Sequence, residues 1–124
     1  MDTHTILWMI NDYGKLSSTA KSMLLNDVNT LHISIASAWE IAIKVSLGKL
    51  IGLSGGAGTF LAKVKTMPIN LLPIAPRYVE MVETLPFIHR DPFDRLLVAT
   101  AKADGMIILT ADKNIHKYNV QSVW

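Results

Sequence analysis

The sequence predicts an α/β protein, a three-layer α/β/α domain in which helices flank a central parallel sheet. Short apolar or alternating segments of strand length take turns along the chain with longer segments of helical periodicity, a pattern typical of parallel sheets. Half of the 124 residues are apolar, which suits a sheet covered on both faces. No internal repeat or low-complexity segment divides the chain, so we expect one domain over residues 1–124.

The first half of the chain predicts three helices and one strand. An acid, Asp2, precedes a turn and a short helix that ends near residues 11–14, and Ser17 or Ser18 caps a second helix to about residue 25. Apolar and polar residues alternate over 31–35, which predicts a strand. Ser37 begins an amphipathic helix that ends near Gly48, and its buried stripe is expected to consist of Trp39, Ala42, Ile43 and Leu47.

The second half begins with glycines at 52, 55, 56 and 58, which predict a flexible connection because no phosphate-loop motif follows them. Helices are expected over residues 59–66 and 76–84, with a short strand over 68–73 between them. Two further strands are expected over residues 106–109 and 120–124.

The helix over residues 91–105 has the clearest signals at both ends. Asp91 is a good N-cap, Pro92 then occupies the first helical position, and Gly105 ends the helix. Asp94 falls in the first turn, where a carboxylate meets the positive end of the helix dipole. The helix leads into the strand at 106–109, and Asp112 follows that strand directly.

Carboxylates therefore recur where strands end or helices begin, the edge of an α/β sheet at which ligands bind. Taken singly, each acid has a structural explanation: a cap, a dipole partner, or for Glu40 an i,i+4 ion pair with Lys44. Taken together, converging carboxylates repel one another unless a cation lies among them, and oxygen ligands of this kind suit Mg²⁺ or Mn²⁺. Two such ions, roughly 3.5–4 Å apart, can activate a water and stabilise the leaving oxygen of a phosphodiester.

Four motifs follow one another in this chain: Asp2-Thr3-His4-Thr5-x-Leu7-Trp8; Ser37-x-Trp39-Glu40-Ile41-Ala42-Ile43-Lys44 with Gly48-Lys49-Leu50; His89-Arg90-Asp91-Pro92-Phe93-Asp94-Arg95-Leu96-Leu97; and Thr110-Ala111-Asp112. Each motif is weak alone. The ordered set, which covers essentially the whole chain, resembles PIN-domain proteins of the VapC toxin type.

The resemblance implies a five-stranded parallel sheet between helices. It implies a Mg²⁺- or Mn²⁺-dependent ribonuclease, the toxin of a type II toxin–antitoxin pair, with RNA as substrate, an antitoxin protein as partner, homodimers and a cytoplasmic location. The family's catalytic and metal-binding acids fall on Asp2, Glu40, Asp94 and Asp112. Asp91 is a nearby auxiliary candidate outside this core set.

Basic and histidine side chains near these acids are candidates for contacts with RNA. Arg90 and Lys44 are expected to contact phosphate, while Arg95 is expected either to do so or to pair with one of the acids. His4 and His89 lie near the acids in the sequence and are further candidates for substrate contact.

The chain departs from the resemblance at its start. In the family an apolar strand of about five residues precedes the first aspartate and occupies the middle of the sheet, whereas here only Met1 precedes Asp2. Without that strand, two neighbouring strands would expose their edges. We therefore expect a chain that is less stable and more prone to associate than one with a strand before Asp2.

Composition restricts the remaining function classes. There is no cysteine, which excludes disulfides and thiolate metal sites, and no apolar run approaches the roughly 18 residues of a membrane span. The net charge of +2 permits a nucleic-acid partner without requiring one. Two alternatives to the nuclease remain: a non-catalytic PIN-like binding module with a shortened N-terminus, and a receiver-like domain that accepts a phosphoryl group on an aspartate.

Overall fold

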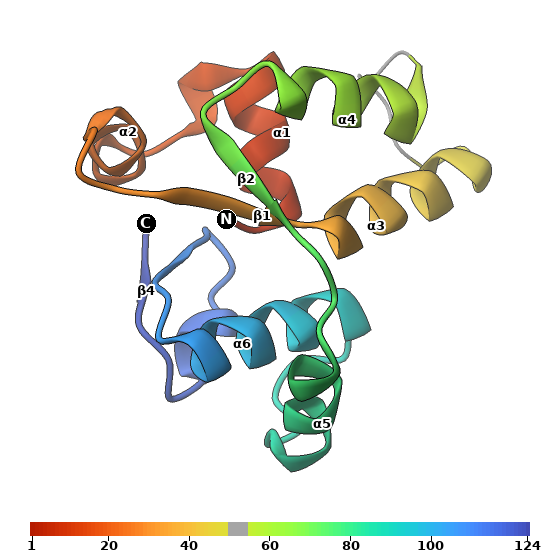
Figure 1. Cartoon of the computed structure of the whole chain (residues 1–124). Coiled ribbons are helices and arrows are strands. Elements are labelled where there is room, and N and C mark those ends of the chain that lie inside the picture. The colour runs from red at the N-terminus through yellow and green to blue at the C-terminus, as the bar shows by residue number, and fades with distance from the viewer. Residues whose placement is uncertain (50–54) are drawn as a thin grey trace.

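The computed structural model describes residues 1–49 and 55–124, so Gly52 of the predicted glycine-rich connection lies outside the described residues. Helices and strands alternate along the chain (Figure 1). The helices are α1 (Thr3–Asn11), α2 (Ser18–Leu25), α3 (Ile35–Ser46), α4 (Gly56–Lys65), α5 (Pro76–Thr84) and α6 (Pro92–Asp104), with short 3-10 turns η1 (Tyr13–Lys15) and η2 (Ile115–Lys117). The strands are β1 (Leu31–Ser34), β2 (Ile69–Leu72), β3 (Ile108–Leu109) and β4 (Ser122–Val123).

The strands pair in parallel, as predicted. Strand β1 pairs with β2 in the register Leu31 to Ile69, and β3 pairs with β4 in the register Ile108 to Ser122. Parallel strands that alternate with helices confirm the predicted α/β class. The described residues do not form the single five-stranded sheet that the resemblance implied. They form two separate two-stranded sheets.

Helices cover the strands on two sides. In Figure 1, α1 and α4 lie on one side of β1 and β2, while α5 and α6 lie on the other. One apolar core joins α1 and α4 to β1 and β2 around Ile6, Ile33 and Phe60, all at most 1 % exposed. A second core joins α6 to β3 around Val98 and Ile108. The helix layers and the strands between them form the three layers that the sequence predicted.

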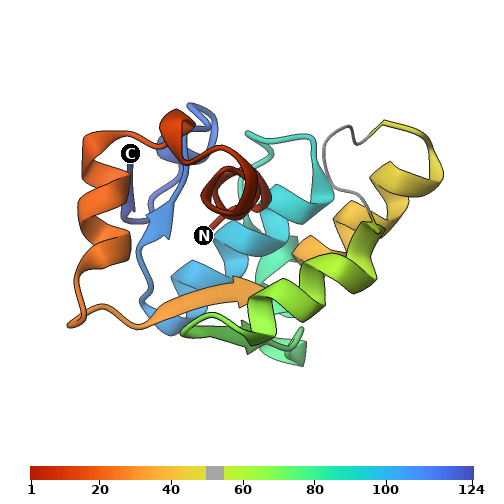
Figure 2. The ribbon, with the colours of Figure 1, turned by 90° about the horizontal axis from the view of Figure 1, so that it is seen from above.

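The N-terminus lies between the two sheets, as the view in Figure 2 shows. The amino group of Met1 donates a hydrogen bond to the carbonyl of His32 in β1, 3.0 Å away. The backbone N–H of Asp2 donates to the carbonyl of Leu109 in β3, 3.2 Å away. The two residues at the start of the chain therefore bridge β1 and β3 at the place where the resemblance expects the end of a middle strand.

Helix α3 differs from the prediction in where it begins and in which face it buries. It begins at Ile35 rather than Ser37, because the Ser34 hydroxyl accepts the N–H of Ala36 and caps it. The predicted buried stripe is wrong: Trp39 is 57 % exposed and Leu47 59 % exposed. The buried face of α3 carries small and polar residues together with one large apolar side chain: Ala36, Ser37, Ala38, Glu40 and Ile41.

Candidate metal and active site

The position of Asp94 is fixed by the capped N-terminus of helix α6. The Asp91 carboxylate caps the helix by accepting the N–H of Phe93 at 2.8 Å, and Pro92 occupies the first turn. Asp94 lies in that same first turn, and Gly105 ends the helix with a φ of +63°, a conformation that favours glycine. The predicted helix and both of its end signals are confirmed.

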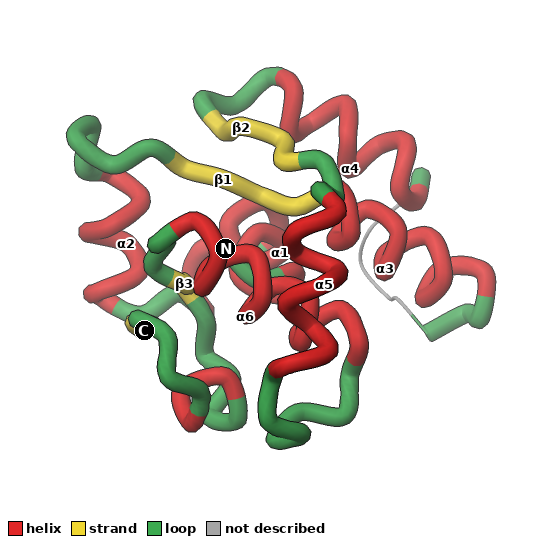
Figure 3. Tube along the Cα trace, turned by 60° about the horizontal axis from the view of Figure 1, so that its bottom comes forward, coloured by secondary structure: helices red, strands yellow, loops and turns green. Residues whose placement is uncertain are grey.

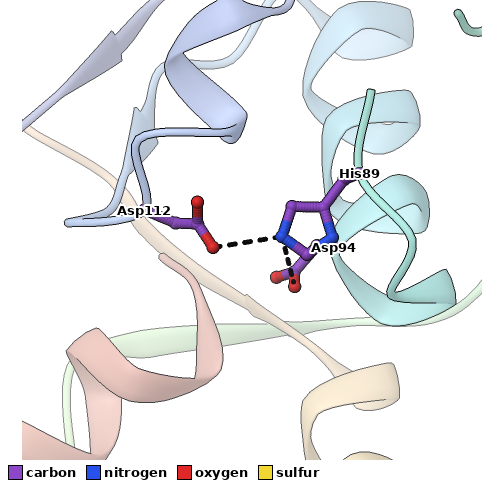
Figure 4. A group of neighbouring side chains, drawn as sticks. All are labelled: His89, Asp94 and Asp112. Atoms are coloured by element: carbon purple, nitrogen blue, oxygen red, sulfur yellow. Dashed lines mark hydrogen bonds and ion pairs between the residues drawn. The ribbon is translucent and has the colours of Figure 1, made fainter. Parts of the chain in front are cut away.

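Asp112 reaches the same place from the end of β3. One carboxylate oxygen, Oδ1, accepts the N–H of Asn114 at 2.6 Å, which fixes the turn after the strand. The other oxygen, Oδ2, lies 3.1 Å from Nε2 of His89, and the same nitrogen lies 3.4 Å from Oδ2 of Asp94 (Figure 4). His89 thus joins two carboxylates from segments that are 18 residues apart in the sequence, 94 to 112.

The tautomer of the neutral His89 ring follows from its other nitrogen. The backbone N–H of Asp91 donates to Nδ1 of His89 at 3.0 Å, so Nδ1 is an acceptor and Nε2 carries the hydrogen. The backbone N–H of His89 donates to the Tyr118 hydroxyl at 2.9 Å, which holds the residue in place. His89 therefore presents a fixed N–H donor toward Asp94 and Asp112, rather than a lone pair for a metal ion.

Asp2 is buried at the start of α1, and both of its carboxylate oxygens accept hydrogen bonds. Its Oδ1 accepts the N–H of Thr5 at 2.6 Å, which makes Asp2 the N-cap of the helix. Its Oδ2 accepts the hydroxyl of Thr110, and the oxygen of that hydroxyl in turn accepts the N–H of Asp112 at 3.0 Å. A short chain of hydrogen bonds therefore connects Asp2 to Asp112.

Glu40 comes from the buried face of α3 and is only 6 % exposed. The Thr3 hydroxyl donates to its Oε2 at 2.5 Å, and Lys44 pairs with its Oε1 one helical turn later. Glu40 and Asp94 line the same small pocket, which also touches Thr3 and Phe93. The pocket connects the carboxylate on α3 with the carboxylate on α6.

The electrostatics of Asp94 reflect this crowding. Burial raises its pKa from 3.8 to about 7, and the neighbouring charges of Asp91, Glu40 and Asp2 add to the rise, while His89 opposes it. The pKa of Asp112 is lowered instead. Burial acts to raise that pKa, but the hydrogen bonds from the Asn114 backbone and from His89 outweigh it. Burial is thus the main reason that the charged form of Asp94 is disfavoured.

The structure brings the four predicted acids into one neighbourhood, contributed by α1, α3, α6 and the turn after β3. Ligand atoms of His89, Asp94 and Asp112 all lie within 4.8 Å of one another. Arg90 is exposed in the segment just before α6, whereas Lys44 is engaged by Glu40. The ring of His4 lies against that of Trp8, with centroids 6.0 Å apart, rather than among the acids.

Arg95 does neither of the things expected of it. It is 9 % exposed, and its guanidinium donates to the backbone carbonyls of Pro86, Val82 and Leu85 at the end of α5. The guanidinium thereby joins α6 to the end of α5 and to the turn that follows it. The expectation that Arg95 contacts RNA or an acid is therefore wrong.

The donor set fits a hard divalent cation. Three carboxylates, on Glu40, Asp94 and Asp112, supply the oxygen ligands that Mg²⁺ and Mn²⁺ prefer. Burial raises the pKa of Asp94 most, the charges of Asp91, Glu40 and Asp2 add to the rise, and a bound cation would offset both effects. His89 does not belong to this ligand set because its Nε2 carries a hydrogen.

A family model described as a PIN domain matches residues 1–121. The chain belongs to the PIN-domain family. PIN domains are typically metal-dependent nucleases, and the family generally uses divalent metals. No curated protein matches the chain. Within the described residues, the helices of this PIN domain include none long and apolar enough to cross a membrane.

Sequence reasoning missed the hydroxyl groups that hold the acids of this PIN domain. Thr3 donates to Glu40, and Thr110 connects Asp2 with Asp112. The signal was present in the sequence, because Thr3 directly follows Asp2 and Thr110 precedes Asp112 by two residues in the quoted motifs. A hydroxyl next to a buried carboxylate is a common way to satisfy its lone pairs.

Proposed function

We propose that this PIN domain is a Mg²⁺- or Mn²⁺-dependent endoribonuclease of the VapC type, the toxin of a type II toxin–antitoxin pair. Its catalytic and metal-binding residues would be Asp2, Glu40, Asp94 and Asp112. The observation that carries the proposal is the site itself: carboxylates from distant segments, two of them buried, lie near Asp94, whose pKa is raised to about 7. A fold keeps such repulsion where a bound cation relieves it.

The four acids would have different roles in cation binding, according to their surroundings. Asp94 and Asp112, which are partly exposed, would contact the cation directly, and Glu40 would approach it from α3. Asp2, with both oxygens already hydrogen-bonded, would act mainly by holding Thr110 and the turn that carries Asp112. A bound divalent ion supplies Lewis acidity and lowers the pKa of water, so the scheme needs no histidine base.

His89 would serve as a hydrogen-bond donor to the substrate. The Nε2–H of His89 points at Asp94 and Asp112, so it would lie where it could donate to a phosphate oxygen held beside these acids. Arg90, exposed just before α6, would contact the RNA backbone. Lys44, which pairs with Glu40, would contact RNA only after leaving that ion pair.

The proposed protein partners, an antitoxin and a second copy of the chain, have a candidate surface on α3. Trp39, Ile43 and Leu47 are 57 %, 36 % and 59 % exposed along one side of this helix. The ring of Trp39 also lies 5.1 Å from that of Phe93 in an edge-on arrangement, next to the acid pocket. A contiguous apolar helix face of this kind is typical of a surface that binds another protein.

The test is degradation of a mixed RNA pool by purified protein in Mg²⁺ and in chelator. We expect cleavage in Mg²⁺ only, and we expect Asp94→Asn to abolish it while the circular dichroism spectrum is kept, because Asn still forms hydrogen bonds but is a poor ligand for the ion. The matched control is Asp104→Asn, a distant acid at the other end of the same helix that pairs with Arg77. Cleavage by Asp94→Asn at the parent's rate would show that Asp94 is structural only.

One specific observation favours the alternative of a non-catalytic PIN-like module. Each carboxylate oxygen of Asp2 accepts one hydrogen bond, from the Thr5 N–H and from the Thr110 hydroxyl, as expected of a structural acid. Under this alternative the purified chain binds RNA without degrading it at any Mg²⁺ concentration. The match to the PIN-domain family over residues 1–121 argues against the receiver-like alternative.

A further inference from the structure

Each of the two acids that line the small pocket directly follows an aromatic residue. Trp39 precedes Glu40 on α3, and Phe93 precedes Asp94 on α6. Helix α3 continues directly from the end of β1 toward the side of the molecule, as Figure 3 shows, and it packs against α6. The ring centroids of Trp39 and Phe93 lie 5.1 Å apart, with the ring planes at 80°. Because Phe93 also lines the pocket, the aromatic pair lies at its edge.

The Trp39 ring keeps a face open to solvent. In an edge-on pair Phe93 covers at most one face of the indole, and Trp39 is 57 % exposed. The other two tryptophans differ, because Trp8 and Trp124 are half-buried and pack against each other with centroids 5.5 Å apart. Contact with Phe93 fixes the orientation of the exposed indole beside the acids. Trp39 is therefore an oriented aromatic surface and not part of a core.

The charges around the pocket limit how it can hold a nucleic acid. Carboxylates repel phosphate except where a cation lies between them. Lys44, one turn after Glu40, already pairs with that carboxylate. The face of a nucleobase carries no net charge, so it can lie beside the acids without this repulsion. Stacking also removes the apolar indole face from water. The open ring of Trp39 thus suits a base better than a phosphate.

We propose that the Trp39–Phe93 pair is a subsite for an unpaired RNA base, which stacks on the open face of the Trp39 indole. Each ring belongs to a residue only one position, about 3.8 Å along the backbone, from an acid of the pocket, so a phosphate of the same strand lies at the acids. Bases in a duplex are already stacked on both faces, so the subsite selects single-stranded segments, whereas stacking itself tolerates any sequence. The inference rests on the proposed function, since it takes RNA as the ligand.

The experiment measures the binding of two short RNAs that differ only in their bases. One is a five-nucleotide adenosine RNA, and the other has the same backbone with stable abasic sugars; both carry the same 3′ fluorophore. Binding is followed by fluorescence anisotropy in Mg²⁺ with the chain that carries Asp94→Asn, which is expected not to cut RNA. In this chain Trp39 is kept, replaced by Leu, or replaced by Phe. Leu47→Ala is the matched control, since Leu47 is an equally exposed apolar side chain two turns later on α3.

We expect the chain with Trp39 to bind the adenosine RNA about tenfold more tightly than the abasic RNA, which is the effect of one stacked base. Trp39→Leu should remove this difference although it keeps an apolar side chain. Trp39→Phe should keep part of the difference, and Leu47→Ala should keep all of it. Circular dichroism checks that each variant is folded, and binding of the abasic RNA checks that contacts with the RNA backbone are kept.

Three results would overturn the proposal: equal affinity for both RNAs in the chain with Trp39, no binding of either RNA, or the same base-dependent difference in Trp39→Leu. If Trp39→Leu changes the mass measured by light scattering but not the base-dependent difference, the ring belongs to a protein interface instead, and the proposal is again overturned. Cleavage of RNA by the parent chain is measured separately. A parent that cuts RNA while the bases make no difference refutes the subsite alone, whereas a parent that never cuts RNA but shows the Trp39-dependent difference refutes the nuclease alone.

Discussion

Replacing Asp94 with Asn should stabilise the protein when no metal ion is present. Burial and the nearby carboxylates raise the pKa of Asp94 from 3.8 to about 7. A group whose pKa is higher in the folded than in the unfolded chain stabilises the fold while it is protonated, and this contribution is lost as the pH rises from about 4 to about 7. Asn resembles the protonated form at every pH, so the variant does not suffer this loss.

The size of this stabilisation can be worked out from the pKa shift of Asp94. Each pKa unit corresponds to about 1.4 kcal/mol, so the whole change would amount to about 4 kcal/mol. The Asp94 side chain is 26 % exposed, and water screens part of this repulsion. The lost charge also gives up about 0.5 kcal/mol of interaction with the dipole of α6. We therefore expect a net gain of about 1–2 kcal/mol, which raises the melting temperature by about 3–8 °C.

The assay is urea unfolding of parent and variant in chelator, from pH 4 to pH 8. The advantage of the variant should be small at pH 4, grow to about pH 7, and then stay constant. Asp104→Asn is the control of opposite sign: hydrogen bonds from Arg77 and Tyr78 lower the pKa of Asp104, so this variant should lose stability at neutral pH. An Asp94 variant that is less stable than the parent at pH 8 would refute the reasoning.

Two further results are expected. Mg²⁺ or Mn²⁺ at millimolar concentration should raise the melting temperature of the parent. A variant with all four site acids neutralised should melt above the parent in chelator and should not respond to metal. A parent melting curve that metal leaves unchanged would remove the main support for a metal site. Thr110→Val should lower the free energy of unfolding by about 1–3 kcal/mol, because Thr110 is fully buried and its hydroxyl bonds both Asp2 and the Asp112 backbone. The exposed Thr84→Val, which loses only one bond to a helix carbonyl, should stay within about 0.5 kcal/mol of the parent.

The elements whose signals are local were predictable from the sequence. The cap at Asp91, the proline after it and the glycine at 105 all act within a few residues, so α6 was predicted with both ends in place. Strand positions followed from apolar runs between turn residues in the same way. The beginning of α3 was missed by two residues because Ser34 and Ser37 are both plausible caps.

The buried face of α3 could not be predicted from periodicity alone. Trp39 and Leu47 have the right spacing for a core stripe, yet they are exposed. The face that packs inward carries Glu40, a residue that belongs to the site rather than to an apolar core. Hydrophobic periodicity thus assigned the wrong side of a helix whose inner face has a polar function.

The sequence predicted only part of the convergence of the acids. Glu40 and Asp112 follow strands, so their common edge was predictable, whereas the position of Asp94 depends on how α6 packs against α3 and β3. The role of His89 was open because its tautomer depends on a backbone N–H two residues away. Exposed strand edges were expected, whereas the separation of the described strands into two two-stranded sheets, and the register of each, were not.

The carboxylates around Asp94 are proposed to form a divalent cation site. The most direct measurement is a Mn²⁺ titration followed by electron paramagnetic resonance, in which bound Mn²⁺ loses the sharp signal of the free ion. We predict saturable binding by the parent chain, competition by Mg²⁺, and loss of binding in Asp94→Asn but not in Asp104→Asn. Equal Mn²⁺ binding by all three proteins, or none by the parent, would contradict the account.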